Sequence, residues 1–113
     1  MSHVLKIDFL KANKKFRPHL ECLVMGKAKV SALYDTGADI SCMALSTFRE
    51  IPIHLRPKKK PVPPVRARGA GNRLLEAVGT YDFDLGFKDR TVSQQITVFR
   101  ELNSGIILGM DLI

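Results

Sequence analysis

An apolar, β-prone run that ends in a tight turn constrains this chain more than any other feature of its sequence. Ala32-Leu33-Tyr34 leads straight into Asp35-Thr36-Gly37, which delivers one carboxylate, one hydroxyl and one glycine at the end of a strand. Strand ends, and the loops that follow them, are where scaffolds usually place chemistry. The stretch 32–41 therefore predicts a functional site centred on Asp35.

A second apolar run, Gly105-Ile106-Ile107-Leu108-Gly109, lies close to the end of the sequence. It carries no polar side chain, so it should lie in the core rather than at the surface. We expect this run to pack against residues 32–34.

Length and composition limit the class of protein. The 113 residues suit one domain with one core, over residues 1–113. No apolar run approaches the roughly 20 residues of a membrane-spanning helix, and the first residues lack the pattern of a signal peptide. We expect the two cysteines, Cys22 and Cys42, to be free thiols in a reducing compartment. The net charge of +7 favours acidic partners or nucleic acid without specifying either.

Alternation of apolar and polar residues predicts an all-β chain with at most one or two short helices. Strands are expected at residues 5–9, 19–25, 30–34, 80–87, 92–98 and 106–108, with a hairpin turn at Gly26-Lys27. The clearest strand places Tyr81, Phe83, Leu85 and Phe87 on one side, and Thr80, Asp82, Asp84 and Gly86 on the other.

The middle of the chain shows other sequence patterns than this alternation. Residues 44–50 predict a short helical turn that Pro52 prevents from extending. Residues 56–64 are basic and proline-rich, and we interpret them as an extended excursion over the surface. Residues 65–77 carry Gly69-Ala70-Gly71-Asn72 between two possible strand arms, which indicates a hairpin.

Asp-Thr-Gly is common by chance, but its context here is specific. The chain resembles the retroviral-type aspartic proteases (retropepsins), and most of all those of long-terminal-repeat retrotransposons. The matching segments are Arg17-Pro18, residues 32–41 and residues 105–111, in the order and spacing of that family. The resemblance runs from about residue 17 to the end and implies a retropepsin-like closed β-barrel, one lobe of an acid protease.

The resemblance also assigns roles. It implies that Asp35 faces its own copy across a two-fold axis, that the two carboxylates share one proton, and that they activate a water. Thr36 would bond across the interface, and Gly37 would let the backbones approach closely. Ala38 and Asp39 would line the substrate cleft. No covalent intermediate, metal or other cofactor is implied.

Gly69, Ala70 and Gly71 fall where the family places its flap, a hairpin that closes over the substrate. A plain surface turn is the alternative interpretation. Two features depart from the family pattern. The first is Met110, which stands where many relatives carry an arginine that would support Asp39 by an ionic contact, although Arg17 could supply that contact instead. The sequence also ends at Ile113, before the helix and strand that complete many retroviral dimers, so the chain is either truncated or dimerises differently.

Other chemistries find less support. Cys42 and His54 lack an orienting partner, and the three histidines lack metal-ligand spacing. The basic patch 66–73 has no aromatic residue to stack on bases, so we do not expect nucleic-acid binding.

The sequence thus predicts an aspartic endopeptidase, active as a homodimer, that cleaves a retroelement polyprotein, its own being the expected substrate. We expect it in the cytoplasm or within a virus-like particle, not bound to a membrane and not secreted. The alternative is a catalytically inactive retropepsin-like module for binding or dimerisation.

Overall fold

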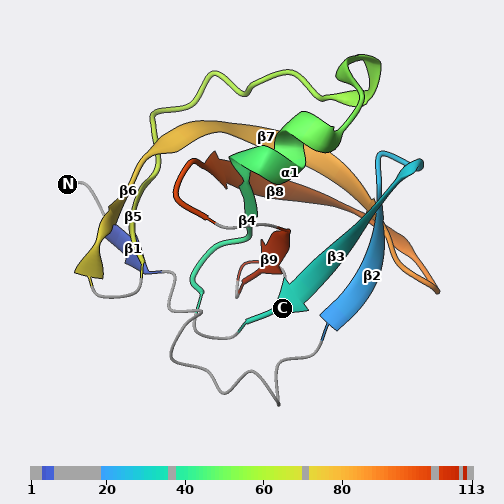
Figure 1. Ribbon diagram of the computed structural model, residues 1–113, viewed down its shortest axis with the longest axis horizontal. Coiled ribbons are helices and arrows are strands. Elements are labelled where there is room, and N and C mark those ends of the chain that lie inside the picture. Colours follow the sequence, from blue (N-terminus) through green and yellow to red (C-terminus); the bar gives the residue numbers. More distant parts are fainter. Residues whose placement is uncertain are drawn as a thin grey trace.

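Six strands close into a barrel. The computed structural model describes residues 4–6, 19–35, 38–69, 72–102, 105–109 and 111. Around the barrel the strands follow the order β2 (His19–Val24), β3 (Ala28–Tyr34), β9 (Ile106–Leu108), β4 (Cys42–Ala44), β8 (Thr91–Phe99) and β7 (Ala77–Gly86) (Figure 1). One short α-helix accompanies them in the described part of the chain. The predicted fold class is confirmed.

The first hairpin forms where the sequence predicted it. β2 and β3 pair antiparallel, with His19 opposite Leu33 and Val24 opposite Ala28. The turn between them needs left-handed backbone at two positions, with φ of 52° at Met25 and 77° at Gly26. Glycine takes such an angle without steric cost, which explains its place at this turn.

The strand β9 is inserted between two strands that lie far from it in sequence. It runs parallel to β3, which brings Tyr34 opposite Leu108, and antiparallel to β4, which brings Cys42 opposite Ile107. All three of its side chains are buried. The expected packing of the two apolar runs is confirmed, and it takes the form of direct backbone pairing.

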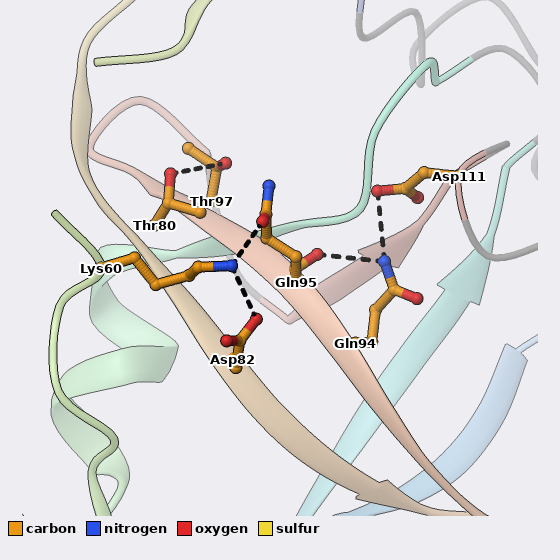
Figure 2. Close-up of polar contacts among 7 residues, drawn as sticks. All are labelled: Lys60, Thr80, Asp82, Gln94, Gln95, Thr97 and Asp111. Atoms are coloured by element: carbon orange, nitrogen blue, oxygen red, sulfur yellow. Dashed lines mark hydrogen bonds and ion pairs between the residues drawn. The ribbon is translucent and has the colours of Figure 1, made fainter. Parts of the chain in front are cut away.

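The longest hairpin joins β7 to β8, and both of its strands contribute large apolar side chains to the core. Tyr81, Phe83 and Leu85 are buried, whereas Asp82 and Asp84 are exposed, as the alternation predicted. Thr80 lies on the same side of β7 as Asp82, as predicted, but unlike Asp82 it is buried. Its Oγ1 lies 3.2 Å from Oγ1 of Thr97 (Figure 2). The residues 56–64 cover this end of β7, which removes Thr80 from solvent.

The helix α1 (Leu45–Glu50) confirms the predicted helical turn, and a single 3-10 turn, η2 (Ile53–Leu55), follows it. Phe48 of α1 packs on β7, with its ring centroid 4.8 Å from that of Tyr81. After η2 the chain runs extended over β7 before it reaches β5 (Arg66–Arg68) (Figure 1). The surface excursion predicted for residues 56–64 is therefore confirmed. Among the described residues no helix is long and apolar enough to cross a membrane.

A second, small sheet lies beside the barrel. It contains β1 (Val4–Lys6), β5 and β6 (Leu74–Leu75), with β5 in the middle. β5 and β6 form the predicted antiparallel hairpin, while β1 pairs with β5 in parallel. The strand expected at residues 5–9 is thus seen in part, because residues 7–10 lie outside the described residues.

Gly109 ends β9 at a point where two backbones nearly touch. A Cβ added there would collide with the carbonyl group of Ile40 and lie 2.8 Å from the carbonyl oxygen of Ala38. Gly109→Ala should therefore lower the free energy of unfolding by about 1–3 kcal/mol, as overpacking does in a rigid core. Chemical denaturation would measure this loss.

Gly86→Ala is the matched control, since its added Cβ would meet Leu23 no closer than 3.4 Å, an ordinary contact. If both variants are as stable as the parent protein, the close approach at Gly109 does not constrain the fold.

Candidate active site

Asp35 directly follows β3, and its backbone N–H and carbonyl are both hydrogen-bonded. Its N–H donates to the carbonyl oxygen of Leu108 over 3.0 Å, and its own carbonyl accepts the N–H of Ala38 at 3.1 Å. Only 4% of the residue is exposed, and Oδ2 is fully buried. The carboxylate therefore belongs to a buried residue whose own backbone is hydrogen-bonded on both its N–H and its carbonyl, which suits a group that must hold its geometry during proton transfer.

Of the other residues predicted around Asp35, the structure describes Ala38 and Asp39. Thr36 and Gly37 lie outside the described residues. Ala38 is fully buried and belongs to a core cluster with Cys42 and Ile107, whereas Asp39 is exposed. Ala38 therefore supports the turn in this chain, and its contact with a substrate stays a prediction.

The hairpin predicted at residues 65–77 is present. Gly69 begins its turn: its N–H donates to the carbonyl of Arg73 over 2.8 Å, and its carbonyl accepts the N–H of Asn72 at 3.2 Å. Ala70 and Gly71 lie outside the described residues. Ala67 and Leu75, one on each arm, pack in the same cluster as Ala38. The arms of the hairpin thus share a core cluster with Ala38, but their use as a flap stays a prediction.

A polar network that the sequence analysis missed connects Ser41, which follows the turn at Asp35, to Gly109 and Asp111. Gly109 N–H donates to Oγ of the buried Ser41 over 3.1 Å, and the Ser41 hydroxyl donates to Oδ1 of Asp111 over 2.7 Å. Nε2 of Gln94, on β8, donates to Oδ2 of Asp111 over 3.2 Å (Figure 2). Ser41 and Asp111 both lie within the two segments that match the family, and a polar residue next to an apolar run expected to be buried was the available signal.

Both thiols are buried and free, as expected. Desolvation raises the pKa of Cys22 to about 11. Desolvation also raises the pKa of Cys42, and the negative charges of Asp111 and Asp35 raise it further. Both sulfurs therefore stay protonated near neutral pH, and a protonated thiol is a poor nucleophile. The described residues also contain no group of three side chains suited to hold a metal ion.

A surface hollow of about 690 Å³ lies beside the site. It is lined by β2, β3 and the turn between β7 and β8, with Cys22, Tyr34 and Phe87 among its residues. Asp35 does not line it, so this hollow is distinct from the site that the sequence predicted.

Comparison with known proteins identifies the family. A family model described as "Aspartyl protease" matches residues 20–112, which include every strand of the barrel except the first residue of β2. The chain belongs to the aspartyl protease family. No curated protein sequence matches it significantly.

Solved structures of retroviral-type proteases share the fold of this chain. The EIAV protease, solved with the inhibitor HBY-793, superposes with a TM-score of 0.69 at 22% identity, over 90% of this chain and 89% of that one. The retroviral protease-like domain of Ddi1 from Leishmania major gives a TM-score of 0.64 at 18% identity, over 85% of this chain and 74% of that one. At these identities the likeness shows the fold, and it confirms the resemblance to retropepsins.

Ser41 offers a test of the network. Ser41→Ala would leave the buried N–H of Gly109 without its acceptor, and an unmade buried hydrogen bond costs about 1–3 kcal/mol. We expect the free energy of unfolding to fall by that amount in urea titrations. Ser93→Ala, an exposed serine on β8, should change stability by less than about 0.5 kcal/mol. Equal stability of the two variants would contradict a structural role for Ser41.

Proposed function

We propose that this aspartyl protease is an endopeptidase that acts as a homodimer, with a water activated between two Asp35 carboxylates. The observation that carries the proposal is the buried Asp35 at the end of β3, whose N–H is hydrogen-bonded to Leu108 of β9 and whose carbonyl is hydrogen-bonded to Ala38. Thr36 and Gly37 complete the motif in the sequence.

The chemistry follows from two carboxylates held close together. Both cannot remain ionised at short range, so the pair shares one proton. The ionised partner removes a proton from the water as the water attacks the peptide carbonyl, and the protonated partner donates to the peptide. Neither step needs a covalent intermediate, so the buried cysteines have no part in it.

The proposal of a dimer rests on the number of suitable carboxylates. The sequence contains one Asp-Thr-Gly, and Asp39 follows too closely on the same turn to oppose Asp35. Asp111 accepts hydrogen bonds from Ser41 and Gln94, which fixes it as a structural group. A two-fold axis beside Asp35 would supply the second carboxylate from an identical surface.

The proposed substrate is a polypeptide, and specifically the polyprotein of a retroelement. In that dimer Ala38 and Asp39 would face the substrate backbone, and Gly69, Ala70 and Gly71 would close over it as a flap. The packing of Ala67 and Leu75 in one cluster with Ala38 supports this arrangement, because movement of the hairpin would reach the catalytic turn directly.

Asp35→Asn should abolish cleavage. The amide cannot accept the proton of the attacking water, so we expect the rate to fall by at least about 100-fold, with circular dichroism and thermal stability close to those of the parent. A peptide-library assay read by mass spectrometry measures the rate, and a statine-type transition-state mimic should inhibit the parent protein.

Asp84→Asn, which changes an exposed carboxylate on β7, is the control and should cleave normally. Cleavage by Asp35→Asn at the parent rate would refute the mechanism.

The dimer makes a separate prediction. Specific activity should rise with protein concentration, and an excess of Asp35→Asn chain should inhibit the parent by forming mixed dimers with a single usable carboxylate. An equal excess of Asp84→Asn chain should not inhibit. Activity that is independent of concentration, together with a monomer in sedimentation, would exclude the dimer. A folded chain that cleaves nothing at any concentration would instead be a retropepsin-like binding module.

A further inference from the structure

The strand β2 is only partly covered on the side that faces β7. It pairs with β3 along its whole length, but β7 pairs only with its last two residues, Leu23 and Val24. β7 ends at Gly86, where the chain turns towards β8. Among the described residues, no strand pairs with this edge of residues 19–22. The barrel therefore leaves a short length of strand edge open.

The alternation of an antiparallel ladder shows which backbone groups point towards the open edge. The N–H of Met25 donates to the carbonyl of Asp84 over 2.8 Å, so it points towards β7. Every second residue of such a strand directs its N–H and carbonyl to the same side, so those of Leu23 and Glu21 also point towards β7. Leu23 lies opposite Gly86, but β7 has ended before the position opposite Glu21. The N–H and carbonyl of Glu21 are therefore directed at the open edge, where a further strand could pair.

The surface hollow of about 690 Å³ lies at the same place, since Glu21 is among the residues that line it. Its volume falls in the range of about 300–1,000 Å³ that is typical of ligand sites. Cys22, Tyr34 and Phe87 give it an apolar lining. Cys22 belongs to the main core cluster, and both aromatic rings pack against that cluster. A side chain that enters the hollow would thus meet an apolar surface that the fold has already formed.

Charged side chains surround this apolar lining. Three are cations, on Lys29, Lys88 and Arg90, and two are carboxylates, on Glu21 and Asp89. All five residues are exposed, and none of them forms an ion pair with another residue of the described ranges. The rim therefore carries an excess of one positive charge. Charges at an exposed rim act mainly on the choice of partner and on the rate of encounter, and here they favour an acidic partner.

We propose that the open edge of β2 and the hollow beside it dock an extended, acidic segment of a partner protein. The segment pairs with the backbone of Glu21 as an added strand, in the place that β7 leaves empty. Main-chain hydrogen bonds then supply affinity, and a pocket for one side chain supplies specificity. One large apolar side chain of the segment fills the hollow, and acidic side chains next to it meet Lys88 and Arg90. Because β2 is already ordered by β3, this side of the interface costs little conformational entropy.

Titration with a set of short, capped peptides tests the proposal. Each peptide carries a central phenylalanine, leucine or isoleucine between two glutamates, with valines outside them. We expect at least one peptide to bind and to shift the amide resonances of Glu21 and of residues 87–90. The same peptide with lysines in place of its glutamates should bind at least about tenfold more weakly, which corresponds to about 1.4 kcal/mol.

The docking site is separate from the catalytic centre, because Asp35 does not line the hollow. The parent chain and Asp35→Asn should therefore bind the peptide equally well, and a statine-type mimic should not displace it. This result is expected whether or not the chain is an active protease. Displacement of the peptide by the mimic would place it in the catalytic cleft and would overturn the proposal.

Two variants of Glu21 separate its backbone from its side chain. Glu21→Pro removes the N–H at the open edge and leaves the hydrogen bonds to β3, which belong to the alternate residues, so binding should fall by at least about tenfold. Glu21→Gln keeps the N–H and removes a negative charge, so it should bind the acidic peptide at least as tightly as the parent does. Circular dichroism checks that Glu21→Pro is folded.

A change in the peptide tests the same pairing without any change in the protein. Methylation of the peptide's backbone nitrogens removes the donors of an added strand, and it should abolish binding. On the protein side, Lys88→Glu should weaken binding by at least about threefold. Lys27→Glu makes the same change of charge in the turn between β2 and β3, outside the hollow, and should bind within about twofold of the parent.

Other results would overturn the proposal. One is the absence of binding by every peptide of the set. Another is equal binding of the methylated peptide, because an apolar group would then occupy the hollow without an added strand. The third is a shift of the same amide resonances with protein concentration alone, because the edge would then be covered by a second copy of this chain.

Discussion

The pairing of β9 with β3 is the constraint on which the rest of this structure depends. It lines up Tyr34 with Leu108 and supplies the carbonyl that fixes the N–H of Asp35. The same strand pairs on its other edge with β4, which follows the turn after Asp35. One short apolar strand thus holds Asp35 in place. A side chain larger than hydrogen at Gly109 would push its backbone away from that of Ala38 and Ile40.

Local patterns in the sequence predicted a large part of this architecture. The first hairpin, α1, the β5–β6 hairpin and the buried face of β7 each depend on neighbouring residues, so periodicity and turn residues reveal them. The position of Asp35 at a strand end follows in the same way. The pairing of the two apolar runs was also expected, because neither could remain in solvent.

Features that join distant segments were missed. The burial of Thr80 depends on a loop that precedes it by many residues, and the parallel pairing of β1 with β5 has no local signature. The Ser41–Asp111 hydrogen bond joins two motifs in which neither Ser41 nor Asp111 was given a role by the sequence analysis. A polar residue inside a buried segment requires a partner, but the sequence alone does not say which residue supplies it.

The place of β9 in the chain has a consequence for folding. Because β3 pairs with a strand that follows it at a long distance in the sequence, the barrel closes only after β9 has been synthesised. Pairings so remote in sequence form slowly, since the chain must first lose the entropy of a long loop. The carboxylate of Asp35 therefore gains its fixed geometry late. For a protease made as part of a longer precursor, this delay would postpone cleavage until the segment carrying β9 has emerged.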